Sequence, residues 1–367
     1  MKKPFKPNDL PLEKLDWMSF VELIGPAHDA VARFDGLLQS IPNPAVLLSP
    51  LTTKEAVLSS KIEGTQATMQ EVLEYEADPQ ITKRTQDIKE VLNYRKAMSK
   101  ATQGLESVGF TLRLMREMHG VLLAGVRGEG QDAGNYRKKD VYIGTPGHPE
   151  SARYVPPSWQ DLDSYLKNFE KYVNGTEKDI LVQLAIVHAQ FEIIHPFGDG
   201  NGRMGRIILP LFLNFKKVLS SPMLYLSEYF EIHRDEYYLK LQNISDNNEW
   251  AEWIRYFLIA VIEQSKINID KGILNEFMNS RETALILGKE PNGSMRATRA
   301  ANLIFMGTKA IKPAHEASVE IIFDNSDKRF NIDKDEISIK RIVRNNGQST
   351  YKINNETKTR QEVLELL

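Results

Sequence analysis

Apolar residues recur at helical spacing along most of the chain, from about residue 27 to residue 271. Apolar side chains three and four positions apart form one face of an amphipathic helix. Such a face runs over residues 111–122, where Thr111 is suited to cap the N-terminus. Another runs over residues 181–194 and must end there, because Pro196 cannot continue a helix. The pattern therefore predicts a mainly helical body.

A short segment departs from this helical pattern. Two β-prone pieces, Val141-Tyr142-Ile143 and Arg153-Tyr154-Val155, enclose a stretch that contains two glycines and two prolines. Turn-forming residues between short β-prone pieces are typical of a β-hairpin. Residues 141–155 are therefore expected to project from the helical body as a hairpin.

The pattern changes again after about residue 288. Residues 289–294 have the composition of a linker, and partly alternating segments typical of strands follow. The expected strands cover residues 318–323, 337–343 and 349–353, with a turn at Asn345-Asn-Gly347, and a helix begins near Thr359. The expected parts are an N-terminal helical region (1–105), a core with trailing helices (106–275) and a small β-rich, α+β segment (284–367).

Composition narrows the classes of function. The chain has 367 residues, more than one average domain, and a formal net charge of −2. A charge so close to zero does not indicate a nucleic-acid or anionic-membrane partner. Cysteine is absent, which excludes disulfides and thiolate chemistry and fits a reducing cytoplasm. The N-terminus lacks the apolar region of a signal peptide and no apolar run is long enough to span a membrane, so a cytoplasmic, soluble protein is expected.

One loop combines the groups that phosphate chemistry needs. Residues 199–203, Asp-Gly-Asn-Gly-Arg, open a helix, and their glycines let backbone N–H groups turn inward around an anion. Arg203 and Arg206 lie on one side of that helix and offer forked donors to phosphate oxygens. Asp199 suits Mg²⁺, and His195 can accept a proton from a hydroxyl. Together these residues predict phosphoryl or nucleotidyl transfer.

The twelve residues from His195 to Arg206, HPFGDGNGRMGR, resemble the signature of the Fic family. The run Gly134-Asn-Tyr-Arg137 resembles the approach to the family's flap hairpin, and Val155-Pro-Pro157 resembles its exit. The resemblance covers about residues 10–270. It implies the helical Fic core with a β-hairpin flap.

The resemblance also implies a protein adenylyltransferase. His195 would deprotonate a Ser, Thr or Tyr hydroxyl of a target protein or of this chain itself, and that hydroxyl would attack the α-phosphate of ATP. Asp199 would hold the Mg²⁺ that bridges the phosphates, and pyrophosphate would leave. The residues expected to contact ATP are Gly200, Asn201, Gly202, Arg203, Met204, Gly205 and Arg206.

Two features refine this expectation. Relatives that resemble the Doc toxin transfer phosphate and carry lysine where this chain has Gly202, so AMP transfer is favoured here. The flap is expected to pair in β fashion with a segment of the target protein, through Val141, Tyr142, Ile143 and Gly144. The flap does not identify the target, because backbone pairing tolerates many side chains.

Residues 59–64, Ser-Ser-Lys-Ile-Glu-Gly, resemble the inhibitory helix motif of the same family. The resemblance implies that Glu63, together with Ser59, lies against Arg206 and keeps ATP in an unproductive pose. Two other interpretations stay open. Glu63 is a solvated residue before a helix cap at Gly64, or it orients a water molecule for the reverse reaction, removal of AMP.

Other candidate sites have weaker support. His188, Glu192 and His195 share one helix face with the spacing of a metal triad, but His188 is better explained as a core histidine bonded to backbone. His233 lies in a stretch that resembles the surroundings of the family's adenosine pocket, and His119 is expected at the surface or in packing. An aromatic cluster at helical spacing is expected in the core: Trp250, Trp253, Tyr256 and Phe257.

Residues from about 284 to the end resemble the N-terminal half of the ATPase head of archaeal SMC proteins. The phosphate loop of such heads, Gly-x-x-x-x-Gly-Lys-Ser/Thr, occurs nowhere in the chain. This tail is therefore not expected to be a motor, and a fusion remnant, a partner-docking module and a DNA-contacting sheet are the alternatives. A non-catalytic, chromosome-associated adaptor is the alternative to the enzyme, and the resemblance to Fic proteins leaves a homodimer open.

Overall fold

The computed structural model describes residues 3–40, 49–77, 85–130, 132–144, 152–270, 315–324, 332–344 and 348–366. The chain divides into two compact units. Met1–Gly272 contains the helices that precede the tail, and Ile273–Leu367 contains a β-sheet.

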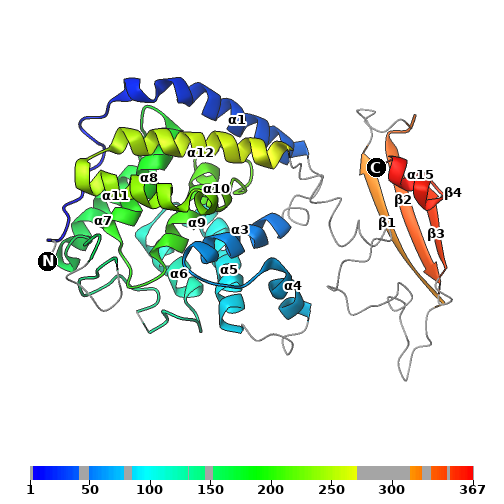
Figure 1. Cartoon of the computed structure of the whole chain (residues 1–367), viewed down its shortest axis with the longest axis horizontal. Helices are drawn as coiled ribbons and strands as arrows, with labels where there is room; N and C mark the ends of the chain where they lie inside the picture. The colour runs from blue at the N-terminus through cyan, green and yellow to red at the C-terminus, as the bar shows by residue number, and fades with distance from the viewer. Residues whose placement is uncertain are drawn as a thin grey trace. The chain divides into compact units, whose positions relative to one another are not determined.

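The first unit is built of α-helices, which confirms the mainly helical prediction (Figure 1). Its first helices are α1 (Val21–Ser40), α3 (Ser49–Ile62), α4 (Met69–Ala77), α5 (Thr85–Val108) and α6 (Leu112–Leu122). The later helices are α7 (Leu162–Asn174), α8 (Ile180–Ile194), α9 (Asn201–Phe215), α10 (Ser227–Ile232), α11 (Arg234–Asn247) and α12 (Trp250–Asp270). Within the described ranges, no helix combines the length and apolar character that crossing a bilayer requires.

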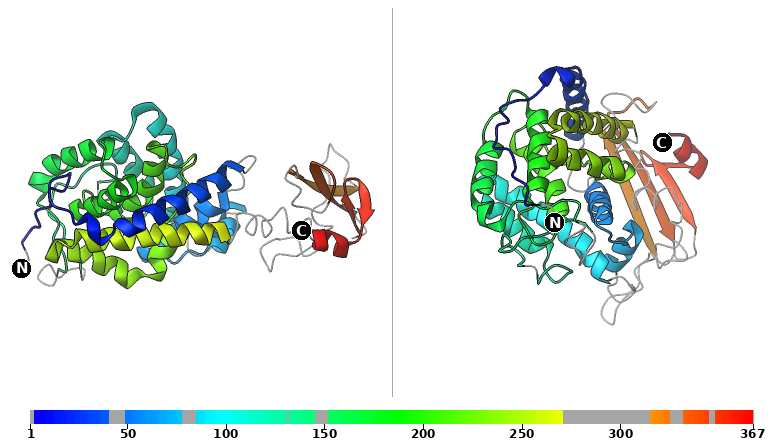
Figure 2. Two further views of the ribbon diagram at one scale, coloured as in Figure 1. Left: turned by 90° about the horizontal axis from the view of Figure 1, so that it is seen from above. Right: turned by 60° about the vertical axis from the view of Figure 1, so that its left-hand side comes forward.

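Helix α8 forms the core of this unit. Almost all of its side chains are buried, as expected for an apolar helix that other helices surround. Trp253 of α12 is fully buried, and its indole N–H donates to the carbonyl oxygen of Ala185 at 2.8 Å. Helix α12 runs beside α1, although the two helices are far apart in the sequence (Figure 1; Figure 2). The whole aromatic cluster is buried, which confirms the prediction: Trp250, Trp253, Tyr256 and Phe257.

The boundary between α8 and α9 agrees with the prediction from Pro196. Helix α8 ends at Ile194, and the next residue, His195, has a left-handed backbone with φ of 50°. Helix α9 begins at Asn201, directly after Gly200 with φ of 76°. These two left-handed residues turn the chain, so α8 and α9 pack against each other with the loop between them at one end.

Two other local predictions concern a helix cap and the hairpin. Thr111 caps α6, because its hydroxyl accepts a hydrogen bond from the backbone N–H of Leu114 at 3.2 Å. The base of the hairpin is an antiparallel bridge between Ile143 and Tyr154, whose N–H and C=O groups bond in both directions. The predicted hairpin tip, residues 145–151, lies outside the described residues.

The second unit contains a four-stranded antiparallel sheet in the order β1-β2-β3-β4. The elements are β1 (Glu316–Asp324), β2 (Glu336–Arg344), β3 (Ser349–Ile353), β4 (Glu356–Lys358) and α15 (Arg360–Leu366). Along β2 buried residues alternate with more exposed ones, so one face of the sheet is covered. The three predicted strands and the final helix are confirmed, whereas the predicted linker and turn, residues 289–294 and 345–347, lie outside the described residues.

Candidate active site

A buried arginine holds the C-terminal end of α8. Arg137 is 4% exposed, and its Nε donates to the carbonyl oxygen of His195 at 2.9 Å. Its Nη2 donates to the carbonyl of Pro157 at 2.6 Å, and its Nη1 to that of Lys139 at 3.1 Å. The last carbonyls of a helix have no partner within the helix and form the negative end of its dipole. Arg137 provides hydrogen-bond donors for these carbonyls and a positive charge beside the dipole. It thereby fixes the backbone that carries the His195 side chain.

Two polar side chains clamp the loop that follows. Asn201 accepts the N–H of Phe197 and donates to its carbonyl, both at 2.9 Å. His119 accepts the N–H of Gly134 at Nδ1 (2.9 Å), so its Nε2 carries the proton and donates to the carbonyl of Asp199 at 3.0 Å. The His119 ring stacks on Phe197 with centroids 3.8 Å apart, and burial lowers its pKa to about 4. The Asn201 side chain therefore shapes the loop, and His119, expected only at the surface or in packing, helps to hold it.

His195 lines a cavity of about 280 Å³. Its Nδ1 lies 3.3 Å from the carbonyl oxygen of Glu192, which makes Nδ1 the donor and leaves Nε2 without a proton. Burial lowers the pKa of His195 to about 4, and the charge of Arg137 adds to the effect. The imidazole is therefore neutral at pH 7 and able to accept a proton.

Arg206 of α9 is fully buried and contacts the end of α3. Its Nε donates to Ser59 Oγ at 2.8 Å, and its Nη2 donates to the Ser59 carbonyl at 2.9 Å and to Glu63 Oε1 at 2.6 Å. Burial acts to raise the pKa of Glu63, but the Arg206 guanidinium outweighs it and holds that pKa below its ordinary value. The pair is therefore charged at pH 7. The structure thus brings Ser59 and Glu63 of the inhibitory motif into contact with Arg206.

The Glu63 carboxylate also covers Gly202. A β-carbon at position 202 would lie 2.1 Å from Glu63 Oε1 and 3.1 Å from Arg206 Nη1, so only glycine leaves this space open. Position 202 belongs to the first turn of α9, where backbone N–H groups lack partners within the helix. Glu63 thus occupies the place at the helix N-terminus that suits an anionic ligand.

Arg203 is paired with a carboxylate that was not among the predicted site residues. Its Nη1 lies 3.1 Å from Glu90 Oε2 of α5, and its Nη2 lies 3.6 Å from Asp199 Oδ1. The side chains of Arg203 and Glu90 are 1% and 3% exposed. Arg203 does not line the cavity of His195 and instead supports the loop from inside the protein.

Asp199 is the candidate metal ligand. Its side chain is 35% exposed, and Oδ1 accepts the N–H of Gly200 at 2.6 Å. A β-carbon at Gly128 would come within 2.6 Å of Asp199 Oδ2, so this glycine keeps the carboxylate uncrowded. Across the described ranges, no group of three or more His, Asp or Glu side chains is arranged to hold a metal ion. One carboxylate still suits Mg²⁺, which commonly binds to substrate phosphates and water with one or two protein carboxylates.

The other walls of the cavity come from α11 and from the base of the hairpin. The α11 residues are Tyr237, Tyr238, Leu241, Gln242 and Ser245, and the hairpin residues are Ile143, Arg153 and Tyr154. The remaining predicted site residues that do not line it include Val141, Tyr142, Gly144, Asp199, Gly200, Asn201, Met204 and Gly205. Tyr142 is 43% exposed, whereas Met204 is fully buried. A hollow with aromatic walls and a few polar groups is typical of a site for a small organic ligand.

The contacts of His188 and the position of Glu192, both on α8, differ in kind. His188 Nδ1 donates to the carbonyl of Gly205 at 3.1 Å, and its Nε2 accepts from the Tyr237 hydroxyl at 2.9 Å. Both nitrogens have partners and burial lowers the pKa of His188 to about 3, so it is a neutral core histidine, as the sequence predicts. Glu192 lines the cavity, and burial raises its pKa to about 7.

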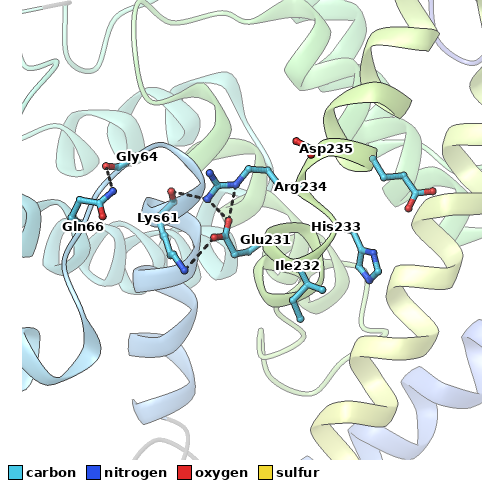
Figure 3. Close-up of a pocket in the computed structure, with 9 residues that line it drawn as sticks. Lys61, Gly64, Gln66, Glu231, Ile232, His233, Arg234 and Asp235 are labelled. Carbon is cyan, nitrogen blue, oxygen red and sulfur yellow. Dashed lines mark hydrogen bonds and ion pairs between the residues drawn. The ribbon is translucent and has the colours of Figure 1, made fainter.

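A second hollow, of about 520 Å³, lies at the C-terminal end of α3 (Figure 3). Arg234 donates to the carbonyl of Lys61 at 3.2 Å and pairs with Glu231, while Lys61 Nζ lies 3.3 Å from Glu231 Oε1. These contacts tie the segment that carries Glu63 to the junction of α10 and α11. His233 lines this second hollow and is not among the residues that line the cavity of His195.

Comparison with known proteins assigns the helical part of the chain to one family. Residues 21–103 match the Fic/DOC family N-terminal region, and residues 109–213 match the Fic/DOC family. The Protein adenylyltransferase Fic of Drosophila melanogaster is 28% identical over 172 residues, which are 45% of this chain and 32% of that protein. This chain therefore spans about a third of the length of that relative. A Fic family protein from Desulfovibrio desulfuricans G20 shares the fold, with a TM-score of 0.60 and 20% identity over 78% of this chain and 81% of that chain.

The tail matches a different family. Residues 282–367 match the RecF/RecN/SMC N-terminal domain. The Chromosome partition protein Smc of Pyrococcus furiosus is 44% identical over 82 residues, which are 22% of this chain but only 7% of that protein. The tail is thus similar to a small part of an SMC protein.

Proposed function

Because residues 21–213 of the chain belong to the Fic/DOC family, we propose that it is an autoinhibited protein adenylyltransferase. It transfers AMP from ATP to a Ser, Thr or Tyr hydroxyl of a protein, including itself. The observation that carries the proposal is the single cavity in which His195, Gly202 and Arg206 meet at the N-terminus of α9. A base, an anion-binding helix terminus and a guanidinium are the groups that nucleotidyl transfer requires.

His195 supplies the base of the proposed reaction. Its unprotonated Nε2 takes the proton of the target hydroxyl as the hydroxyl oxygen bonds to the α-phosphorus of ATP. The bond from that phosphorus to the oxygen leading to the β-phosphate breaks, and pyrophosphate leaves. The first N–H groups of α9 receive the phosphate oxygens. Asp199 is the residue that would hold Mg²⁺, and the ion would neutralise charge on the leaving group.

The hairpin base supports a role in holding the target. Ile143 lines the cavity beside His195, and Tyr142, one residue earlier, is 43% exposed. A target segment added along residues 141–144 brings its hydroxyl toward the base. Because main-chain hydrogen bonds supply most of such an interaction, the target must present an extended, accessible segment.

The Arg206 contacts support autoinhibition. Its guanidinium already binds the carboxylate of Glu63 and the backbone and hydroxyl of Ser59. The outer phosphates of ATP must therefore compete with an internal anion for the same donors. ATP can bind beside Glu63 only in a pose in which its α-phosphate is not aligned for attack.

Removal of AMP at the same cavity is the second candidate function. Glu63 and His195 both line the cavity, which places a carboxylate where it can orient a water molecule toward an AMP-modified side chain. In that case the protein releases AMP from modified protein with Glu63 present, and Glu63→Gly abolishes the release. An adaptor that acts only through the tail predicts no ATP binding by the helical unit.

Labelled ATP distinguishes transfer of AMP from transfer of phosphate. The Glu63→Gly variant, incubated with Mg²⁺ and ATP, is expected to incorporate label from the α-phosphate and none from the γ-phosphate. The physical reason is that the proposed pose sets the α-phosphorus against His195, and Gly202, which lines the same cavity, has no side chain to exclude the β- and γ-phosphates. Incorporation of the γ-label contradicts AMP transfer, and parallel incubation of His195→Ala controls for chemical labelling.

The ion pairs in the second hollow predict that a substitution there weakens the proposed inhibition by Glu63, although less than removal of Glu63 itself (Figure 3). Arg234→Gln removes the donor to the Lys61 carbonyl and the partner of Glu231, so the segment that carries Glu63 is held less firmly. Because Arg234 is partly exposed, self-modification is expected to rise by only about fivefold.

The matched control is Lys240→Gln, which breaks a 3.0 Å ion pair with Glu252 that does not involve α3. The rate of incorporation of α-labelled ATP into the protein itself is the measurement. Equal rates for Arg234→Gln and Lys240→Gln contradict the predicted link between the second hollow and Glu63.

A further inference from the structure

The two motif arginines of α9, Arg203 and Arg206, pair with carboxylates that differ in their exposure to the cavity and to solvent. Arg206 and its partner Glu63 both line the cavity, and the Glu63 side chain is 30% exposed. Neither Arg203 nor its partner Glu90 lines the cavity, and both side chains are almost completely buried. Glu63 is therefore able to move away from its arginine into solvent, whereas Glu90 is a fixed counter-ion.

Glu90 holds Arg203 in one orientation. Glu90 Oε2 binds Nη1 of Arg203 at 3.1 Å, which leaves Nη2 facing Asp199 Oδ1 at 3.6 Å. The Nε of Arg203 is buried and has no hydrogen-bond partner among the described residues. Without the Glu90 anchor the guanidinium can adopt other rotamers, so Asp199 and its loop lose a fixed neighbour.

Glu90 is also bonded to the segment that follows Glu63. Thr65 is buried, and its hydroxyl donates to Glu90 Oε2 at 2.9 Å, the same oxygen that binds Arg203. The backbone N–H of Thr65 donates to the carbonyl of Ser60 at 3.1 Å, which ties this segment to the last turn of α3. One oxygen atom thus connects the loop of Asp199 to the inhibitory segment.

We propose that Glu90 is a positioning residue for the nucleotide site, which acts by holding Arg203 against Asp199 and so preorganises the loop that receives the phosphates. This inference rests on the proposed function. Glu90 contacts no substrate itself. Its carboxylate carries the charge that keeps Arg203 in place in both the inhibited and the active protein.

The test is the affinity for α,β-methylene-ATP with Mg²⁺, measured by titration calorimetry in the full chain carrying Glu63→Gly. The methylene bridge prevents release of pyrophosphate, so binding is measured without turnover. Adding Glu90→Gln is expected to weaken binding about tenfold, because the loop is no longer preorganised. Glu90→Asp, which keeps the buried charge but withdraws it by one methylene group, is expected to weaken binding in the same direction.

The control is Glu170→Gln, a partly buried carboxylate that accepts the N–H of Leu112 at 2.7 Å and does not line the cavity. Its affinity is expected to match that of the parent. Because Glu90 acts through Arg203, Glu90→Gln is expected to weaken binding no further in a protein that already carries Arg203→Gln. Simple structural damage instead gives losses that add.

Unchanged affinity in folded Glu90→Gln and Glu90→Asp overturns the inference. So does tighter binding, because it makes Glu90 a competitor of the phosphates for Arg203. If the parent carrying Glu63→Gly binds no analogue, the proposed function fails and this inference fails with it. If the parent binds the analogue and both Glu90 variants bind it equally well, only the inference about Glu90 fails.

Discussion

Glu63→Gly is expected to raise the rate of self-modification with ATP by about 10- to 100-fold. The carboxylate leaves Arg206 Nη2 and the space above Gly202, so the outer phosphates of ATP gain both the guanidinium and the end of α9. A hydrogen bond between charged groups in a buried setting contributes about 1.5–3 kcal/mol, and each 1.4 kcal/mol changes a rate by a factor of ten. Incorporation of α-labelled ATP into the protein measures this rate.

Glu63→Gln provides the graded comparison for this substitution. The amide retains the size of the side chain and a weaker hydrogen bond to Arg206, so an intermediate rate is expected. Ser59 still binds the guanidinium in both variants. If Glu63→Gly modifies itself no faster than the wild type, the Glu63 carboxylate does not inhibit the reaction and its contact with Arg206 is only structural.

His195→Ala in the same Glu63→Gly protein is expected to lower the rate by about 100- to 10,000-fold, the usual range for loss of a general base. Binding of α,β-methylene-ATP should persist, because Arg206 and the N-terminus of α9 remain. Full loss of nucleotide binding instead assigns His195 to binding. A rate close to that of the parent contradicts its role as the base.

The pH dependence of the same reaction follows from the environment of His195. Burial lowers its pKa to about 4, and the negative charge of Glu63 opposes that shift, so Glu63→Gly leaves the pKa no higher. The neutral imidazole is the base and exists above this pKa. The single-turnover rate should therefore stay high through pH 6.5, the midpoint for an ordinary histidine, and fall only as the pH approaches about 4. A fall centred near 6.5 contradicts a buried, neutral base.

The helices and the turn between α8 and α9 follow from local sequence signals. The left-handed residue that ends α8 lies next to Pro196, which forbids continuation of the helix. The contact between Glu63 and Arg206 joins residues 143 positions apart, and only the similarity of both motifs to one family pointed to it. Periodicity cannot supply such a pair, because it reports which face is buried and not what lies opposite.

Glu90, His119 and Arg137 were not predicted as supports of the loop. Each acts on backbone or side chains that are distant in sequence, and Glu90 is 113 positions from Arg203. A signal for Glu90 was nevertheless present. It lies on the face of α5 that continues through Tyr94, Ala97 and Ala101, which are fully buried. A carboxylate in a buried apolar stripe requires a cation or hydrogen-bond donors, or it is held neutral, so the stripe indicates a buried partner for Glu90 without identifying Arg203.

Gly202 gives the inhibitory contact an evolutionary consequence. Any other residue there puts a β-carbon into the space of the Glu63 carboxylate, 2.1 Å from Oε1. A substitution at position 202 is therefore expected to disturb the Glu63 contact and the space for the phosphates in the same step. A longer side chain at this position is expected to require the Glu63 carboxylate to shift from its place beside Arg206. In the proposed enzyme, selection at this one position therefore acts on inhibition and on phosphate binding together.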